Sequence, residues 1–297
     1  MKLLVAIDSS AVSRTIVSEV ARRPWPSRTV ACVLHIMDLP PLPSDASLIQ
    51  AIEQSANLLV KEATDTLDKA GLQATSKVLE GNPRIAVAEY AKEWGADLVL
   101  VGSHGTSGVV RFLLGSVAQA ALRRSPCSVE IVRRPPQDST VATSAMKILI
   151  GTDGSDCAMA AVRSVAQRPW PAGTQVCVIS AIPLIVPLGE IVAFPVTPVY
   201  PTPDAIESLE KQWRVRAQEA VARAWQILSE ARLKAIETEF LPVGDARQVI
   251  LDQAKSWGAD LIVVGSHGYH AIDRLMLGSV SESVAMHAHC SVEVIRE

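Results

Sequence analysis

The stretch Trp94-Gly-Ala-Asp-Leu-Val-Leu-Val-Gly-Ser-His-Gly105 returns almost unchanged as Trp257-Gly-Ala-Asp-Leu-Ile-Val-Val-Gly-Ser-His-Gly268. In each copy a Trp-Gly pair ends a helical stretch, and a short apolar run without alternation follows it. Such a run is typical of a parallel strand that is buried on both faces. The glycines after it are expected at the carboxyl end of that strand, where open α/β sheets bind their ligands.

The repetition extends beyond this block, so the chain consists of two diverged copies of one domain. Lys2-Leu-Leu-Val-Ala-Ile-Asp8 returns as Lys147-Ile-Leu-Ile-Gly-Thr-Asp153 at an offset of 145 residues, whereas the glycine block is offset by 163. The second copy therefore holds a net 18 additional residues between these blocks. A length of 297 residues fits two domains. We expect domain 1 over residues 1–134, a linker over 135–145 and domain 2 over 146–297.

Each copy alternates apolar strands with helical segments, which predicts a doubly wound parallel sheet with helices on both faces. Asp8 and Asp153 close the first strands, and Asn82 and Asp245 are expected to cap a later helix. The other expected elements are second strands over Val30–His35 and Val176–Ser180, helices over Ser10–Arg23, Ala46–Lys69 and Asp204–Leu233, and third strands over Ala74–Leu79 and Ala235–Leu241.

The composition argues against several classes of partner. The 28 basic and 31 acidic residues give a net charge of −3, which supplies no electrostatic drive toward nucleic acid or anionic lipid. Only five apolar residues separate Lys2 from Asp8, too few for a signal peptide, and prolines interrupt the apolar stretch 181–200. The five cysteines are odd in number and lack C-x-x-C spacing. These features predict a cytoplasmic protein with reduced thiols and with no membrane, nucleic-acid or metal-site partner.

The glycine-rich loop is the candidate site of chemistry. Gly102-Ser-His-Gly105 is followed after nine residues by Gly115-Ser116, and the second copy repeats this spacing from Gly265 to Ser279. Glycines let a backbone approach phosphate oxygens closely, and a Gly-Ser pair at a helix start offers N–H groups, a hydroxyl and the positive end of the dipole. The loop therefore indicates a phosphate site in each copy. The alternative is that the glycines only make turns and that the serine only caps its helix.

Two familiar nucleotide-binding loops are absent from the sequence. No G-x-x-x-x-G-K-[ST] occurs, which argues against a P-loop motor or GTPase. No G-x-G-x-x-G follows the first strand of either copy, where Asp8-Ser-Ser and Asp153-Gly-Ser stand instead. A dinucleotide-binding dehydrogenase is therefore disfavoured.

The pattern G-x2-G-x9-G-[ST], together with an Asp that closes the first strand, resembles the ATP-binding type of the universal stress protein family. The resemblance covers both copies almost end to end. It implies two α/β domains in tandem, each a five-stranded parallel sheet of order 3-2-1-4-5 with the adenine nucleotide alpha hydrolase-like fold. It also implies that the domains pair through their last strands as a pseudo-twofold unit, and that the ligand is ATP with Mg²⁺.

The resemblance further implies roles for particular residues, although Ser9 departs from the family's Asp-Gly-Ser. Asp8 and Asp153 would hold the adenosine end of the nucleotide. The residue just after the second strand, Ile36 or Ala181, would touch adenine through its backbone. The phosphates would be lined by Gly102, Gly105, Gly115, Ser116 and the backbone of Val117 in copy one, and by Gly265, Gly268, Gly278, Ser279 and the backbone of Val280 in copy two.

Other features admit two interpretations each. His104 and His267 either assist phosphoryl chemistry or pack as ordinary loop residues. The basic cluster of Arg123, Arg124, Arg133 and Arg134 is interpreted as a solvated face, with nucleic-acid contact as the weaker alternative. Cys157 has no counterpart in copy one and lies near a helix start, so a redox role is a minor hypothesis. The Pro-rich insertion 182–203 either packs over its own chain or docks on another subunit.

The leading hypothesis is a cytosolic, ATP-binding regulatory protein of the stress-response type, in which binding couples nucleotide level to an interaction. No strong catalytic constellation is visible in the sequence. The alternatives are a slow ATP hydrolase or phosphotransferase that uses the same loop, and a structural or interaction module that binds no nucleotide. The expected partners are the nucleotide and the sister domain, with a homodimer as a further assembly.

Overall fold

The computed structural model describes residues 1–39, 46–105, 114–133, 145–184, 202–231, 233–235, 241–269 and 277–296. The first copy contains β1 Lys2–Ala6, α1 Ala11–Arg22, β2 Val30–Met37, α2 Ala46–Lys69, β3 Gln73–Glu80, α3 Pro83–Trp94, β4 Leu98–Gly102, α4 Ser116–Arg124 and β5 Ser128–Val132. The second copy contains β6 Lys147–Gly151, α5 Asp156–Gln167, β7 Gln175–Ile179, α6 Pro203–Glu230, β8 Lys234–Ala235, α7 Ala246–Trp257, β9 Leu261–Gly265, α8 Ser279–His287 and β10 Ser291–Ile295.

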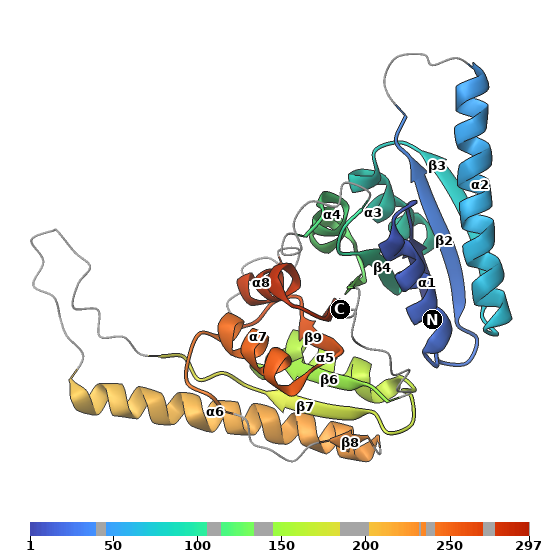
Figure 1. The fold of residues 1–297 in the computed structure, drawn as a ribbon. Coiled ribbons are helices and arrows are strands. Elements are labelled where there is room, and N and C mark those ends of the chain that lie inside the picture. The colour runs from blue at the N-terminus through green and yellow to red at the C-terminus, as the bar shows by residue number, and fades with distance from the viewer. Residues whose placement is uncertain are drawn as a thin grey trace, which may run out of the picture.

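The described strands form one continuous sheet in the order β3-β2-β1-β4-β5-β10-β9-β6-β7-β8. Within each copy the neighbouring strands are parallel, and each half has the order 3-2-1-4-5. The long helices α2 and α6 run along the outer strands at the two ends of this sheet (Figure 1). The predicted doubly wound α/β fold is confirmed.

Helices cover both faces of the sheet because successive strand residues point to opposite faces and both are apolar. In the first copy, Leu3 and Val5 pack with residues of α1 and α2, whereas Leu4 packs with residues of α3 and α4. The cluster that contains Leu4 continues into α7 and α8 of the second copy. One hydrophobic core is therefore shared by the two halves.

The helix that precedes each glycine block begins and ends as its sequence predicts. The side chain of Asn82 accepts from the N–H of Arg84 (3.0 Å), and Gly95 ends α3 in the left-handed conformation at φ +70°. In α7, the side chain of Asp245 accepts from the N–H of Arg247 (2.9 Å), and Gly258 ends the helix in the left-handed conformation at φ +70°. These local signals fix where the glycine loop leaves the sheet.

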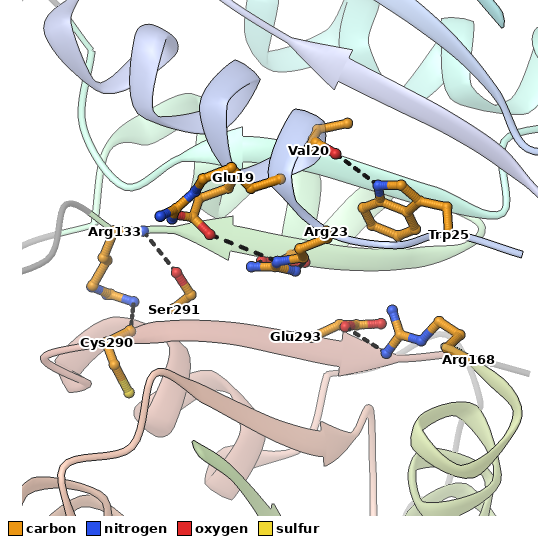
Figure 2. A network of polar contacts seen from close by, with 11 residues as sticks. Glu19, Val20, Arg23, Trp25, Arg133, Arg168, Cys290, Ser291 and Glu293 are labelled. Atoms are coloured by element: carbon orange, nitrogen blue, oxygen red, sulfur yellow. Dashed lines mark hydrogen bonds and ion pairs between the residues drawn. The ribbon is translucent and has the colours of Figure 1, made fainter. Parts of the chain in front are cut away.

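The two copies pair through their last strands, as the resemblance implies. Strands β5 and β10 are antiparallel, and Glu130 lies directly opposite Glu293. Each carboxylate binds an arginine of its own copy. Arg23 makes two hydrogen bonds to Glu130 (2.8 and 2.6 Å). Arg168 makes one to Glu293 (2.8 Å), as Figure 2 shows. All four side chains are buried. The interface is thus built around four paired charges.

Burial and pairing act against each other in this quartet. Burial raises the pKa of Glu293, although the Arg168 guanidinium opposes that shift. Burial alone would lower the pKa of Arg23, but Glu130, Glu19 and Glu293 more than offset it and raise that pKa. A buried charge without a partner destabilises the folded state. Loss of either arginine should therefore destabilise the interface, because its carboxylate would remain buried alone.

The interpretation of the basic cluster as a solvated face is wrong for Arg133. Its guanidinium donates to the carbonyl oxygen of Cys290 in the other copy (3.4 Å; Figure 2). It also donates to the carbonyl oxygen of Ala285 (2.6 Å), and burial lowers its pKa to about 10. Reciprocally, Arg296 of the second copy donates to the carbonyl oxygen of Leu122 in the first copy (2.6 Å). Each copy therefore caps a helix end of the other copy with an arginine.

Several sequence predictions fall partly outside the described residues. Of the insertion 182–203, residues 182–184, 202 and 203 are described, and Ile182 makes backbone hydrogen bonds with Pro242 and Gly244 (2.9 and 2.8 Å). The predicted strand Ala235–Leu241 is described at Ala235, which lies in β8, and at Leu241, which lies outside the strands. The linker 135–145 is described at its last residue. Among the helices that the structure describes, none is long and apolar enough to cross a membrane.

Candidate functional site

The first copy has a cavity of about 700 Å³ at the carboxyl ends of β1, β2 and β4. It lies at the topological switch point, where the chain leaves β1 in one direction and β4 in the other. All seven residues predicted for copy one line it: Asp8, Ile36, Gly102, Gly105, Gly115, Ser116 and Val117.

The second copy has a cavity of about 470 Å³ in the corresponding place. It too is lined by all seven predicted residues: Asp153, Ala181, Gly265, Gly268, Gly278, Ser279 and Val280. The structure therefore brings together residues that lie far apart in the sequence, twice, at the same edge of the sheet.

The start of α4 forms one end of the first cavity. The N–H of Gly115 donates to the carbonyl oxygen of Ser103 (2.7 Å), so it is not among the free donors at this helix start. The first helical hydrogen bond runs from Gln119 to Gly115 (3.0 Å). The N–H groups of Ser116, Val117 and Ala118 precede that bond and lack helical partners, and these residues line the cavity. They remain as donors for an anion.

The second copy reproduces this geometry. Gly278 donates to the carbonyl oxygen of Ser266 (2.7 Å), and Glu282 makes the first helical bond to Gly278 (2.9 Å). In addition, the hydroxyl of Ser281 donates to the carbonyl oxygen of Gly265 (2.6 Å). The helix-start ends of the two cavities are therefore built alike, except for this additional bond of Ser281.

The aspartate and the second loop glycine face each other in both copies. A Cβ atom on Gly105 would lie 2.8 Å from Asp8 Oδ2, and one on Gly268 would overlap Asp153 Oδ2. Only glycine leaves room for this close approach. The carboxylate thus lies beside the loop, at the boundary between the two ends of each cavity.

The two aspartates are held differently. Asp8 Oδ1 accepts from the N–H of Ser10 (2.9 Å) and from the hydroxyl of Ser13 (2.8 Å). Asp153 Oδ1 accepts from the N–H of Ser155 (2.9 Å), and Ala158 stands where copy one has Ser13. The first carboxylate therefore has one more donor fixing its orientation.

The end of the second strand differs from its prediction in copy one. Ile36 lies inside β2 and not just after it, because β2 continues to Met37. Ala181 does follow β7, as expected. Both residues still line their cavities, at the end opposite the helix start.

Sequence reasoning missed His35, which also lines the first cavity. Its Nδ1 lies 2.9 Å from the carbonyl oxygen of Ile7. Because a carbonyl oxygen only accepts, Nδ1 is the donor in this contact. Its place at the end of a predicted strand was the available signal. Ser180 stands at the equivalent position in copy two.

The loop histidines line their cavities and contact the neighbouring serine. The Oγ atoms of Ser103 and Ser266 lie 3.1 and 3.0 Å from Nδ1 of His104 and His267. A part in phosphoryl chemistry stays a hypothesis for both. Within the described ranges, no group of three or more His, Cys, Asp or Glu side chains could hold a metal ion.

Comparison with known proteins agrees with this architecture. A model of the universal stress protein family matches residues 1–133 and 145–296. A universal stress protein of Mycolicibacterium smegmatis is 27% identical over 312 aligned positions, covering 99% of this chain and 96% of the relative. Universal stress protein YxiE of Bacillus subtilis is 30% identical over 146 positions, 44% of this chain and 98% of the relative.

A solved structure has the same fold across the whole chain. The crystal structure of a universal stress protein from Archaeoglobus fulgidus superimposes with a TM-score of 0.66 at 19% identity, covering 99% of this chain and 98% of that one. Two successive matches to one family model explain the internal repeat. The chain belongs to the universal stress protein family and carries two of its domains in tandem.

Proposed function

We propose that this protein binds ATP at its two glycine-loop cavities and acts as a regulatory protein of the stress-response type. The observation that carries the proposal is the convergence of fourteen predicted residues on two equivalent cavities, seven in each. Nucleotide level would then be coupled to an interaction of the protein and not to metabolic turnover.

The chemistry at the two ends of each cavity suits a nucleotide. At one end, the first-turn N–H groups and the hydroxyl of Ser116 or Ser279 provide donors and a positive dipole end for phosphates. At the other end, apolar side chains such as Ile36, Val87 and Ile250 offer a surface for a base. Between them, the Asp8 or Asp153 carboxylate can accept from sugar hydroxyls.

Mg²⁺ would arrive with the nucleotide. The described residues offer no cluster of metal ligands, whereas Mg²⁺ bound through phosphates needs only one or two protein ligands and keeps several waters. The serine hydroxyl at the helix start is the candidate protein ligand nearest to the phosphate end. All five cysteines are free, which suits the reducing cytoplasm as the proposed compartment. The homodimer stays a prediction.

Titration calorimetry with ATP and Mg²⁺ tests the proposal, and the repeat supplies matched variants. A Cβ on Gly115 would lie 3.2 Å from the carbonyl oxygen of Ser103, and one on Gly278 would lie 3.1 Å from the Cα of His267. Gly115→Val should abolish binding in the first cavity alone, and Gly278→Val in the second alone. The wild-type stoichiometry should therefore fall by the same step in each variant.

Two outcomes would favour a different function for this protein. Sustained phosphate release that Gly115→Val or Gly278→Val abolishes would favour the alternative of a slow hydrolase or phosphotransferase. No heat of binding, with a melting temperature that excess ATP leaves unchanged, would favour the non-nucleotide module, because a ligand of the folded state must stabilise it.

A further inference from the structure

A thiol, an imidazole and a hydroxyl meet behind the glycine loop of the second copy. Cys157 is the second residue of α5, and its Sγ lies 3.3 Å from Nε2 and 3.5 Å from Nδ1 of His267. The hydroxyl of Ser266 lies 3.7 Å from the same sulfur. Cys157 and His267 are 110 residues apart in the chain. His267 also lines the 470 Å³ cavity, so the residue that contacts the sulfur borders that cavity.

Two further features lie close to the sulfur of Cys157. The thiol lies in the first turn of α5, where the helix dipole is positive. Arg296 is close enough that Cys157 opposes the lowering of its pKa by burial. His267 is within reach of the same thiol as a proton acceptor. A helix start, a guanidinium and an imidazole of different origin therefore lie close to one sulfur.

Copy one has the same contact between a serine and a histidine but lacks the thiol. His104 and Ser103 make the same contact as His267 and Ser266, but Val12 stands at the position of Cys157. The arrangement is thus not a general requirement of the fold, since a valine fills the position in the sister domain.

Burial acts on the pKa of each of the other four cysteines. Burial raises the pKa of Cys32 and Cys177, and it raises the pKa of Cys127 to about 11 and of Cys290 to about 12. These thiols stay protonated at neutral pH and are poor nucleophiles. They serve as internal references in the same chain.

We propose that Cys157 and His267 form a modification site at which a hydroperoxide oxidises the Cys157 sulfur. His267 takes the thiol proton, and the resulting thiolate attacks one peroxide oxygen. The S–O bond forms as the O–O bond breaks, and the leaving hydroxide takes the proton back from the imidazolium as water. With hydrogen peroxide the products are a sulfenic acid, one water and neutral His267. Sulfur is oxidised by two electrons and the peroxide is reduced by two.

Oxidation at this place would reach the ligand cavity. A Cβ on Gly265 would lie 2.6 Å from the backbone of Cys157, so the loop and the start of α5 are in tight contact. An added oxygen on the sulfur must displace His267 or Ser266, which belong to that loop. The consequence, weaker ligand binding in the second cavity only, rests on the function proposed above.

The test uses the full-length, reduced protein. Hydrogen peroxide is added at low excess with dimedone, which traps sulfenic acids, and the labelled cysteines are identified by peptide mass spectrometry. Cys157 is 6% exposed whereas Cys127 is half-buried, so accessibility alone predicts that Cys127 is labelled first. The proposal predicts that Cys157 is labelled first. Labelling of Cys127 ahead of Cys157 would overturn it.

Two histidine variants separate chemistry from access. His267→Gln should slow labelling of Cys157 by about tenfold, because the proton acceptor is lost. His287→Gln is the matched control, since His287 is exposed on α8 and bonds Ser283 within its own helix. An equal rate in His267→Gln and wild type would contradict the proposal, and the order of labelling in wild-type protein decides it even if a variant fails to fold.

A final arm separates this proposal from the proposed function. MgATP is titrated into reduced and oxidised protein, and the oxidised form should lose the binding that Gly278→Val abolishes. If the reduced protein binds no ATP, the nucleotide proposal fails, whereas selective labelling of Cys157 still supports the modification site. If ATP binds and full oxidation of Cys157 leaves both sites unchanged, the coupling to the cavity is refuted.

Discussion

At the scale of single residues, the two copies differ at the position after the first-strand aspartate. Gly154 has φ +84°, and a Cβ there would lie 2.7 Å from Arg223 Nη2 and 3.0 Å from Ala220. Ser9 occupies the equivalent position and lies outside the left-handed region. After Gly154, the Ser155 side chain caps α5, whereas Ser10 makes no cap bond to α1. One residue therefore decides the shape of the turn beside each cavity.

Exchange of these residues between copies should have unequal effects. Gly154→Ser forces a side chain into the left-handed region and against Arg223, which should lower the free energy of unfolding by about 1–3 kcal/mol. Ser9→Gly mainly adds freedom to the unfolded chain and should cost less than about 1 kcal/mol. Urea denaturation followed by circular dichroism compares the two. Equal losses would refute the assignment of the strained turn to copy two alone.

At the scale of elements, α3 and α7 are matched helices with chemically different caps. Asn82 caps α3 and Asp245 caps α7, each by accepting from the N–H two residues later. The side chain and the backbone N–H of Arg247 lower the pKa of Asp245 to about 2. A carboxylate with a lowered folded-state pKa stabilises the protein above its ordinary pKa near 3.8, and this contribution is lost as the pH falls toward 2.

The stability lost on alanine substitution should depend on pH at one of these caps and not at the other. Asn82→Ala and Asp245→Ala should each lower the free energy of unfolding by about 1 kcal/mol at pH 7. The loss from Asp245→Ala should shrink between pH 5 and pH 3, because the wild-type carboxyl then gains protons more readily in the unfolded chain. The loss from Asn82→Ala should stay constant, since an amide does not titrate. Denaturation at several pH values measures both, and parallel pH profiles would contradict the cap assignment.

At the scale of the whole molecule, one sheet and one shared core join the two domains. The buried pairs Arg23–Glu130 and Arg168–Glu293 lie where β5 and β10 meet. Arg23→Met would leave Glu130 fully buried without its partner, which should cost about 3–5 kcal/mol. The neighbouring Arg22 has a 57% exposed side chain, so Arg22→Met should change stability by less than about 0.5 kcal/mol.

Thermal unfolding monitored by calorimetry tests this pair of variants. The shared core predicts one transition for wild type and for Arg22→Met, with Arg23→Met melting at a clearly lower temperature. Similar melting temperatures for the two variants would show that the buried quartet does not support the interface. Two well-separated transitions in wild type would contradict the coupling of the two domains through the core cluster that they share.

Much of the fold follows from local sequence signals. The apolar runs that end at Gly102 and Gly265 are buried strands, and Gly95 and Gly258 end their helices because a left-handed residue is needed there. The repeat itself made the tandem arrangement visible. These signals act within a few residues, so they can be interpreted without the fold.

The contacts that escaped the sequence join distant segments. Strand β2 continues through Ile36 and Met37 because Leu79 and Glu80 of β3 pair with them, and no local pattern contains that information. The same holds for Arg133, whose partners lie on the other copy. The sequence indicates a separate hypothesis for Cys157 and for His267, whereas their contact forms only in the fold.

The central claim is that both glycine loops hold a nucleotide. The most direct measurement is the nucleotide content of freshly purified protein, released by denaturation and separated by chromatography. We expect ATP at about two equivalents per chain, with the amount reduced by Gly115→Val and Gly278→Val separately. No bound nucleotide, together with no heat on titration with ATP and Mg²⁺, would contradict it.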